Sequence, residues 1–378
     1  MKRFLCVLSA LAILFICCYT VEAEQESKSV YPLATVLAEG TTGTVISAEN
    51  ADVQMPQGSL CKLMTILLTA EEIADGNLNS DTVLTASANA NSQSGAVIWL
   101  MQGESITVDE LLKAVIIGNA NDASVVLAEH IGGTEEEFVD MMNARAFELG
   151  MRNTVYKSCT GNSDIDGQYS TASDTAKLAC ELLKHDFLKK YFTSWIDNVR
   201  DGQTELVNEN RLVRTYEGIT GMKAGRSESA GYALAMTAEK NESSFISVVM
   251  GCQDKDERFD IGKSLINAGF SSYKVTTPSF SDEFIKPISV RKGKQSAVMI
   301  TAENLDELVI PKNSGEMSTV VLLPDYIEAP VSKGQIVGRI GFYNGDSLLF
   351  ETNLIATEKI EKSDFASSLK KVLSIMYK

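Results

Sequence analysis

A serine and a lysine separated by two residues open a long apolar-striped segment of the chain. Ser59-Leu60-Cys61-Lys62 is followed by apolar residues at positions 63, 66, 67, 70, 73 and 74, and the pattern stops at Gly76. In a helix, residues three apart lie on one face with their Cβ atoms about 5–6 Å apart. The spacing therefore predicts a helix that carries a hydroxyl nucleophile, Ser59, beside an amine that can act as its base, Lys62.

Few other side chains of the chain can act as a base. The two histidines, His130 and His185, both lie in segments with helical apolar periodicity. Their small number argues against a Ser-His-Asp triad and against a zinc site. Four widely spaced cysteines follow the first 23 residues: Cys61, Cys159, Cys180 and Cys252. Without a CxxC pair they form no disulfide framework, so we expect free, buried thiols, no metal and no cofactor.

Two stretches further along the chain add polar groups that fit such a site. Asn119-Ala120-Asn121 lies at the head of a predicted helix, and Lys223-Ala224-Gly225 precedes Arg226-Ser227. A lysine on a glycine-flanked strand edge can hold a carboxylate. An SxxK pair, a Ser-x-Asn element and a Lys-Thr-Gly element together are the signature of serine β-lactamases and penicillin-binding proteins.

From about Pro32 to Lys359 the chain resembles the low-molecular-mass penicillin-binding proteins, which are D-alanyl-D-alanine carboxypeptidases. The resemblance rests on the ordered combination of motifs rather than on any single one. Further matching stretches are Asn50-Ala51-Asp52, Met55-Pro56, Asn121-Asp122-Ala123-Ser124, Tyr169-Ser170-Thr171-Ala172-Ser173-Asp174, Ala230-Gly231-Tyr232 and Pro330-Val331-Ser332-Lys333-Gly334-Gln335.

This resemblance implies a role for each site residue. Ser59 attacks the carbonyl of a D-Ala-D-Ala bond and Lys62 takes its proton, which requires a pKa well below the usual value of about 10.4. Lys223 supplies the nearby cation and pairs with the substrate carboxylate. The Ser59 amide and a donor from the strand after Gly225 stabilise the oxyanion, and Asn121 holds the substrate amide. Water then hydrolyses the acyl-enzyme, and β-lactams are expected to acylate Ser59 as inhibitors.

Two positions depart from the family pattern. Asn119 stands where the motif usually has serine, and a carboxamide is a poor proton relay, although it can hydrogen-bond Lys62 and keep it oriented. Ala224 stands where the motif has threonine, and the lost hydroxyl weakens substrate binding by roughly 1–3 kcal/mol if nothing replaces it. Ser227 is a candidate replacement.

Three functions remain open on these residues. The first is an active carboxypeptidase that trims peptidoglycan stem peptides. The second is a catalytically weakened, penicillin-binding-like wall-binding protein, because of Asn119 and Ala224. The third, a β-lactamase or esterase, is ranked last because no Glu-x-x-Leu-Asn element lies between the second and third motifs.

The remaining pattern predicts an α/β (α+β) domain in which helices pack on an antiparallel sheet closed by distant segments. A hairpin is expected over 32–47, and paired strands over 231–236 and 245–250. Helices are expected over 107–117, 121–133, 134–149, 170–185 and 257–268, with Thr171 or Ser173 as the cap of the 170–185 helix and Gly269 ending the last one. The composition changes near Thr276, where proline and short β-rich runs predict a small all-β domain with an Asn344-Gly345 hairpin.

The ends of the chain predict its location. Residues 1–23 have the charged start, short apolar core and small-residue end of a secretory signal peptide, with an uncleaved anchor as the alternative. The predicted domains are therefore a signal at 1–23, a peptidase domain at 24–276, an all-β domain at 277–362 and a terminal helix at 363–378. We expect an exported protein at the outer face of the bacterial cytoplasmic membrane or in the cell wall.

The terminal segment has its own apolar stripe, formed by Phe365, Leu369, Val372, Leu373 and Met376. An amphipathic helix with lysines beside its stripe can lie on a membrane surface, and it can also pack on the β-domain. We expect the membrane surface as its partner, because this segment is basic and the body is acidic. The net charge of −16 argues against nucleic acid as a partner.

Overall fold

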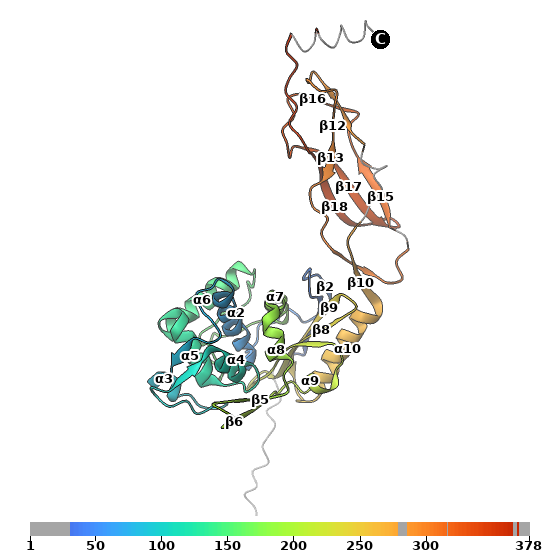
Figure 1. Ribbon diagram of the computed structural model, residues 1–378. Coiled ribbons are helices and arrows are strands. Elements are labelled where there is room, and N and C mark those ends of the chain that lie inside the picture. Colours follow the sequence, from blue (N-terminus) through green and yellow to red (C-terminus); the bar gives the residue numbers. More distant parts are fainter. Residues whose placement is uncertain (1–30, 279–285, 316, 366–368, 370–378) are drawn as a thin grey trace, which may run out of the picture. The chain divides into compact units, whose positions relative to one another are not determined.

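The computed structural model describes residues 31–278, 286–315, 317–365 and 369 (Figure 1). The predicted signal peptide and most of the predicted terminal helix lie outside these residues. Internal contacts divide the chain into two units, one of residues 1–36, 48–236 and 247–262 and one of residues 37–47, 237–246 and 263–378.

A five-stranded antiparallel sheet has the order β2-β1-β9-β8-β7, so its neighbouring strands come from both ends of the predicted peptidase domain. The strands are β1 (Ala34–Glu39), β2 (Val45–Glu49), β7 (Ile219–Ser227), β8 (Gly231–Lys240) and β9 (Ser243–Cys252). Consecutive residues of β8 and β9 are buried, which means that both faces of the sheet are covered. This confirms the predicted sheet closed by distant segments, and it places β7 at the edge.

Helix α2 (Lys62–Ala74) lies at the centre of the helical region and contacts four other helices (Figure 1). These are α4 (Val108–Ile116), α5 (Asn121–Gly132), α6 (Glu135–Glu148) and α7 (Ala172–Leu183). All five helices are where the sequence predicts them. The first nine residues of α2 are buried on every side, more completely than a single apolar stripe requires, because neighbours surround it.

The starts of three helices follow from their capping residues. The hydroxyl of Thr107 accepts from the Glu110 amide, and the Glu110 side chain accepts from the Thr107 amide, a complete capping box at α4. Thr134 caps α6 and Thr171 caps α7 in the same way, each by accepting from the amide three residues on. Of the two caps considered for the 170–185 helix, Thr171 is the one used.

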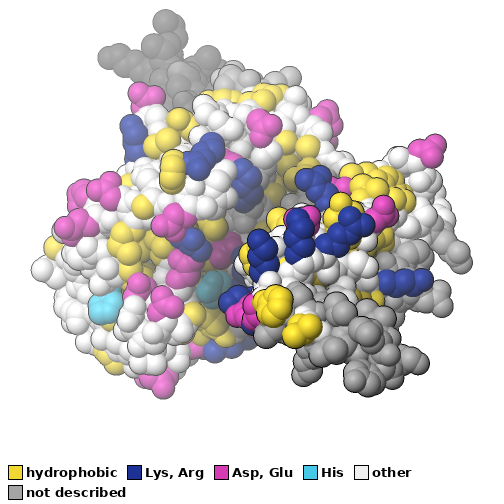
Figure 2. Space-filling view, turned by 90° about the horizontal axis from the view of Figure 1, so that it is seen from above, with side chains coloured by type: hydrophobic (Ala, Val, Ile, Leu, Met, Phe, Trp, Pro, Cys, Tyr) yellow, Lys and Arg dark blue, Asp and Glu magenta, His cyan; other side chains and the backbone are white. Residues whose placement is uncertain are grey.

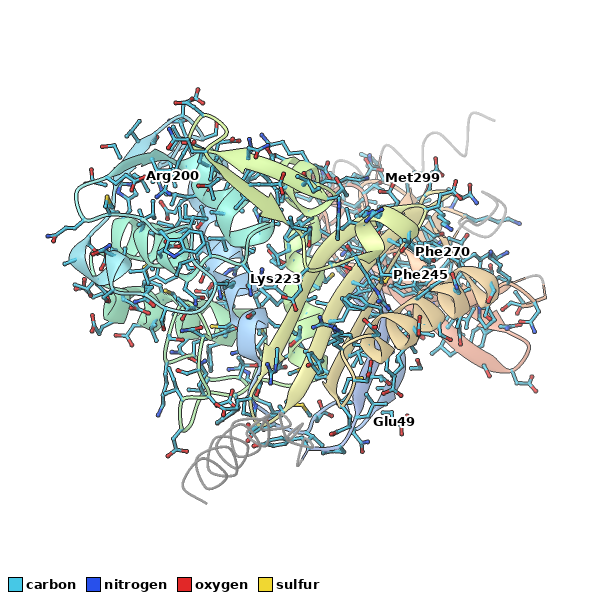
Figure 3. All side chains as sticks on the ribbon, turned by 90° about the horizontal axis from the view of Figure 1, so that it is seen from below. Glu49, Arg200, Lys223, Phe245, Phe270 and Met299 are labelled. Atoms are coloured by element: carbon cyan, nitrogen blue, oxygen red, sulfur yellow. The ribbon has the colours of Figure 1, made fainter. Side chains whose placement is uncertain are left out.

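Helix α10 (Glu257–Ser272) corrects the prediction that Gly269 ends it. A Cβ on Gly269 would lie 2.9 Å from the Phe245 ring, so glycine is needed here for close packing and not for a turn. Phe245 and Phe270 meet edge to face, with ring centroids 5.0 Å apart (Figure 3).

Several short elements were not predicted, because three or four residues are too few to show a period. They are η1 (Gly58–Cys61), α3 (Ala88–Asn91), η2 (Asp186–Leu188), α8 (Lys189–Phe192), α9 (Leu212–Thr215), β3 (Val83–Thr85), β4 (Ser105–Thr107), β5 (Ile196–Val199) and β6 (Thr204–Val207).

The β-rich region after α10 has sheets of the orders β10-β14, β12-β11-β16 and β13-β18-β17-β15. Its strands are β10 (Tyr273–Thr276), β11 (Ile288–Arg291), β12 (Ala297–Val298), β13 (Ile300–Ala302), β14 (Leu308–Pro311), β15 (Ser318–Leu322), β16 (Tyr326–Glu328), β17 (Ile336–Asn344) and β18 (Ser347–Ala356). Asn344 pairs with Ser347, so the turn residues are Gly345 and Asp346, one position later than predicted. The region has its own apolar core, which includes Ile340, Phe342 and Leu354.

The surface carries charges of both signs. On the face shown in Figure 2, acidic and basic side chains are interspersed. Among the described residues, no helix is long and apolar enough to cross a membrane.

Candidate active site

Ser59 lies in the short helix η1, which runs directly into α2 at Lys62. The SxxK pair therefore spans a junction of two helix types rather than one α-helical turn. The junction needs Gly58, whose φ is +51° and where a Cβ would collide with the Arg226 carbonyl of β7. Ser59 remains partly exposed, whereas Lys62 is fully buried.

Lys62 has the surroundings of a general base. Its Nζ donates to the Thr160 carbonyl at 2.7 Å. Burial lowers the pKa of Lys62 to about 8, although Cys61, Cys159 and Glu209 act in the opposite direction. About a tenth of the amine is therefore neutral at pH 7 and able to accept a proton, and this share rises as the pH approaches 8.

Asn119 contacts the nucleophile and not the base. Its backbone has a φ of +58°, and its Nδ2 donates to Ser59 Oγ at 3.0 Å. The predicted bond to Lys62 is absent from the described contacts, and the Lys62 amine donates to Thr160. The Asn119 Oδ1 is buried without a partner.

Asn121 begins α5 and is 2% exposed. Its Nδ2 donates to the Ser94 carbonyl at 2.6 Å, and its Oδ1 is buried without a partner. An unpaired buried carbonyl oxygen is available to an incoming N–H group, which agrees with the predicted role toward a substrate amide.

Asp122 holds a loop beside the site, a role that the sequence reasoning did not assign to it. Its carboxylate, 1% exposed, accepts from the amides of Ile98 at 3.0 Å and Leu100 at 3.0 Å. The Arg200 guanidinium holds the other side of this loop through the Ile98 carbonyl at 2.6 Å. The sequence signal that could have predicted this role is a carboxylate in the first turn of an otherwise apolar helix.

Lys223 lies on β7, at the border between the helices and the sheet (Figure 3). It is 4% exposed, and its Nζ donates to the Val115 carbonyl at 2.9 Å. Burial, and then repulsion from the Lys62 charge, lower the pKa of Lys223 to about 7, and Glu209 opposes both.

Gly225 brings β7 against the backbone of the nucleophile. A Cβ at this position would lie 3.1 Å from the Leu60 amide nitrogen and 3.5 Å from the Ser59 carbonyl carbon. Arg258, 3% exposed, donates from Nη1 to the Gly225 carbonyl at 2.6 Å and from Nη2 to Glu209 at 3.0 Å. Arg258 therefore fixes the strand that faces Ser59, a second role that sequence reasoning missed.

Ser227 is not free to replace the missing threonine hydroxyl. Its Oγ donates to the Asp164 carboxylate at 2.8 Å, and it accepts from the Ala230 amide at 3.0 Å. Ser229 also donates to Asp164, from its Oγ at 2.6 Å and its amide at 2.7 Å. A carboxylate is a stronger acceptor than a neutral group, which explains the orientation of this hydroxyl.

The Ser158–Asp164 loop connects all three motifs. Its Thr160 carbonyl accepts from Lys62, Asn162 Nδ2 lies 3.4 Å from Ser94 Oγ beside the Asn121 site, and Asp164 holds Ser227. The loop has no helical or strand periodicity, so no sequence pattern predicts this role.

The cysteines near the site are free thiols, as predicted. Burial raises the pKa of Cys61 to about 12 and raises that of Cys159 well above its ordinary value. Both thiols are therefore protonated near neutral pH, which makes them poor nucleophiles.

Comparisons with known proteins agree with this site. Residues 20–254 match the family described as D-alanyl-D-alanine carboxypeptidase, and residues 273–362 match the C-terminal domain of penicillin-binding protein 5. D-alanyl-D-alanine carboxypeptidase DacF of Bacillus subtilis is 33% identical over 99% of this chain and 98% of its own length. DacC of Escherichia coli is 30% identical over 92% of this chain and 88% of its own length.

Two solved structures extend the comparison. Penicillin-binding protein 5 of Haemophilus influenzae superposes with a TM-score of 0.79 at 26% identity, over 87% of this chain and 97% of that protein. Penicillin-binding protein D2 of Listeria monocytogenes, solved in its ampicillin-bound form, gives a TM-score of 0.57 at 27% identity, over 66% of this chain and 99% of that protein.

Proposed function

Because the chain belongs to the D-alanyl-D-alanine carboxypeptidase family, we propose that it removes the terminal D-alanine of peptidoglycan stem peptides through an acyl-enzyme on Ser59. The chain is a serine-type carboxypeptidase whose substrates are peptidoglycan peptides and which binds β-lactams. The assignment of roles to individual residues is our proposal.

The observation that carries this proposal is the set of contacts around Ser59. The hydroxyl is held by Asn119, lies three residues before the buried Lys62, and faces a strand that carries the second buried amine, Lys223. A hydroxyl, a base of lowered pKa and a nearby cation are the components of nucleophilic acyl transfer.

The reaction begins when the neutral Lys62 amine takes the Ser59 proton and the Ser59 oxygen attacks the carbonyl carbon of the D-Ala-D-Ala bond. The negative charge on the carbonyl oxygen is stabilised by the Ser59 amide and a backbone donor after Gly225. The C–N bond then breaks, the leaving D-alanine amine takes the proton that Lys62 removed from Ser59, and water hydrolyses the ester on Ser59.

The leading experiment incubates the purified 24–378 protein with labelled penicillin and, separately, with a D-Ala-D-Ala peptide, beside Ser59→Ala. A Ser59-dependent adduct with release of D-alanine supports the proposal. An adduct without release of D-alanine indicates the second function, a catalytically weakened wall-binding protein, which Asn119 and Ala224 kept open. Rapid turnover of penicillin indicates a β-lactamase. If wild-type protein takes no Ser59-dependent label, the proposal is wrong.

We also propose that the protein acts outside the cytoplasmic membrane and is held at its outer face by residues 363–378. The family acts on the cell wall, which implies export, and the apolar stripe of the terminal segment supports attachment. Deleting residues 363–378 is expected to move the protein from the membrane fraction to the soluble exported fraction. Membrane attachment that persists in the deletion variant would assign the anchor to another segment.

A further inference from the structure

Trp99 carries a large apolar side chain that is 74% exposed to solvent. The residues on either side of it, Ile98 and Leu100, are buried, so they anchor the Ala96–Leu100 loop and leave the Trp99 ring outside the core. The Trp99 backbone has a φ of +57°, a conformation that bulky residues rarely adopt. Neither core packing nor the backbone gains from this arrangement, which is typical of a residue kept for a ligand.

The loop that carries Trp99 is fixed by hydrogen bonds from two directions. Asp122 accepts from the amides of Ile98 and Leu100, each at 3.0 Å. Arg200, labelled in Figure 3, donates from Nη1 to the Ile98 carbonyl at 2.6 Å and from Nη2 to the Trp99 carbonyl at 3.1 Å. The backbone of the exposed residue is therefore in place before a ligand arrives, which lowers the conformational entropy lost on binding.

The same loop begins at the active site. The Asn121 amide donates to the Ala96 carbonyl at 2.7 Å, and a Cβ on Gly95 would lie 3.2 Å from Asn121 Nδ2. Trp99 follows Gly95 by four residues, and four residues span at most about 14 Å. A substrate that extends a few residues beyond Asn121 can therefore reach the exposed ring.

The substrate itself indicates what covers this ring, a step that rests on the proposed function. A stem peptide is bonded to the amino-sugar chain of peptidoglycan, so the part of the substrate beyond the peptide is carbohydrate. The C–H groups on the face of a sugar ring pack on an indole ring, whereas the hydroxyl and acetamido groups at its edge need polar neighbours.

Polar neighbours are present around the loop. Ser94 and Gln102 are exposed on its two sides, and Asn91, also exposed, donates from Nδ2 to the Leu100 carbonyl at 2.8 Å. A lipid chain or an apolar protein surface over Trp99 would remove such groups from water without pairing them. A ring with polar groups at its edge fits this surface better.

We propose that Trp99 binds the carbohydrate part of the substrate, its indole ring stacking on an acetylated amino-sugar ring of the glycan chain that carries the stem peptide. The proposed function assigns no contact to these sugars. Trp99 makes the protein prefer peptides that are still attached to the glycan over free peptides of the same sequence.

The test compares two substrates that differ only in the sugars: a disaccharide–pentapeptide that ends in D-Ala-D-Ala, and the free pentapeptide. Release of D-alanine is measured for the purified 24–378 protein and for Trp99→Ala. We expect the KM for the disaccharide–pentapeptide to rise about 3- to 10-fold with kcat unchanged, the range for losing one aromatic contact. Both constants for the free pentapeptide should stay within about twofold, because it has no sugar ring.

Two further variants sharpen the result. Trp99→Phe keeps an aromatic ring on the loop and should retain most of the preference for the disaccharide–pentapeptide. Phe147→Ala is the matched control, because Phe147 is also a largely exposed aromatic residue but lies on α6. It should leave the kinetic constants for both substrates unchanged.

The inference is overturned if Trp99→Ala leaves the KM for the disaccharide–pentapeptide unchanged. It is also overturned if the constants for the two substrates change equally, which would indicate a displaced loop. Weaker binding of Trp99→Ala to vesicles of anionic phospholipid, with unchanged KM values, would assign the ring to a membrane surface instead. Wild-type protein that releases D-alanine from neither substrate would overturn the proposed function, and this inference with it.

Discussion

At the residue scale, the chemistry depends on two lysines that are almost completely removed from water. Burial is the largest cause of the lowered pKa of both Lys62 and Lys223, and each amine is satisfied by a backbone carbonyl rather than by a carboxylate. A buried carboxylate partner would hold a lysine in its charged form, whereas a carbonyl leaves it able to lose a proton. This is the physical reason why an amine serves as a base here.

The first prediction concerns the pH dependence of acylation. Lys62 acts in its neutral form, and its pKa is about 8, so protonation inhibits the reaction as the pH falls below that value. We expect the rate of Ser59 acylation by penicillin to rise about tenfold per pH unit from pH 6 toward 8 and then to level off. A stopped-flow or quenched-label series across this range measures it, and a flat profile would contradict a base of this pKa.

The second prediction concerns Asn119, whose amide donates to the nucleophile. Asn119→Ala removes one hydrogen bond, worth roughly 0.5–1.5 kcal/mol, and should slow Ser59 acylation by up to about tenfold. Asn241→Ala is the control, because Asn241 also has a positive φ, +50°, but lies in the turn between β8 and β9. Equal acylation rates for Asn119→Ala and wild type would show that this amide does not position Ser59.

At the element scale, the η1–α2 junction is held between β7 and the Ser158–Asp164 loop. Glycines make both approaches possible: a Cβ on Gly58 would collide with the Arg226 carbonyl, and one on Gly161 would collide with the Gly58 carbonyl. A second loop, Ala96–Leu100, is held by the head of α5 through the Asn121 amide and the Asp122 carboxylate. Ser59 and Lys62 therefore lie on helices and Lys223 on a strand, whereas Asn119 lies in the turn between α4 and α5. Loops tie these elements together.

The third prediction tests the attachment of the Ala96–Leu100 loop. Asp122→Asn replaces one acceptor of the Ile98 and Leu100 amides by a donor, and each buried unsatisfied group costs about 1–3 kcal/mol. We expect a lower free energy of unfolding in urea together with slower Ser59 acylation. Asp140→Asn, an exposed carboxylate on α6, should change neither measurement. A lower free energy of unfolding with an unchanged rate of Ser59 acylation would show that this loop does not affect the site.

At the scale of the whole molecule, the β-rich region has a core of its own. The apolar cluster that includes Val290, Ile340 and Phe342 contains residues from 288 to 360 only, and this stretch falls within the match to the C-terminal domain of penicillin-binding protein 5. We propose the boundaries 24–276 and 277–362 for the peptidase and β-domains, since a separate core allows separate folding.

The fourth prediction follows from that separate core. Phe342 is completely buried, and Phe342→Ala should destabilise the β-domain by about 3–5 kcal/mol. We expect a low-temperature unfolding transition to appear in calorimetry while penicillin labelling of Ser59 is retained. Val320→Ala, a partly exposed position of β15, should have little effect. If calorimetry instead shows a single unfolding transition, and labelling of Ser59 is lost, the two domains unfold as one unit.

The sequence by itself determined which residues are candidates for the site and where the long helices lie. The SxxK pair, Asn121 and Lys223 were identified because a motif needs only residue type and spacing. Five helices were placed because nine or more residues show a clear period. Short elements and the continuation of α10 through Gly269 were missed, since the reason for a glycine lies in what packs against it.

Only the tertiary structure decided which group each polar side chain contacts. The partner of Lys62 is a carbonyl 98 residues further along the chain, and the partner of Ser227 is a carboxylate 63 residues before it. Such bonds join segments that have no pattern in common, so spacing alone could not choose between Lys62 and Ser59 for Asn119, or between substrate and Asp164 for Ser227. The lowered pKa values depend on the same contacts, because burial is a property of the packed chain.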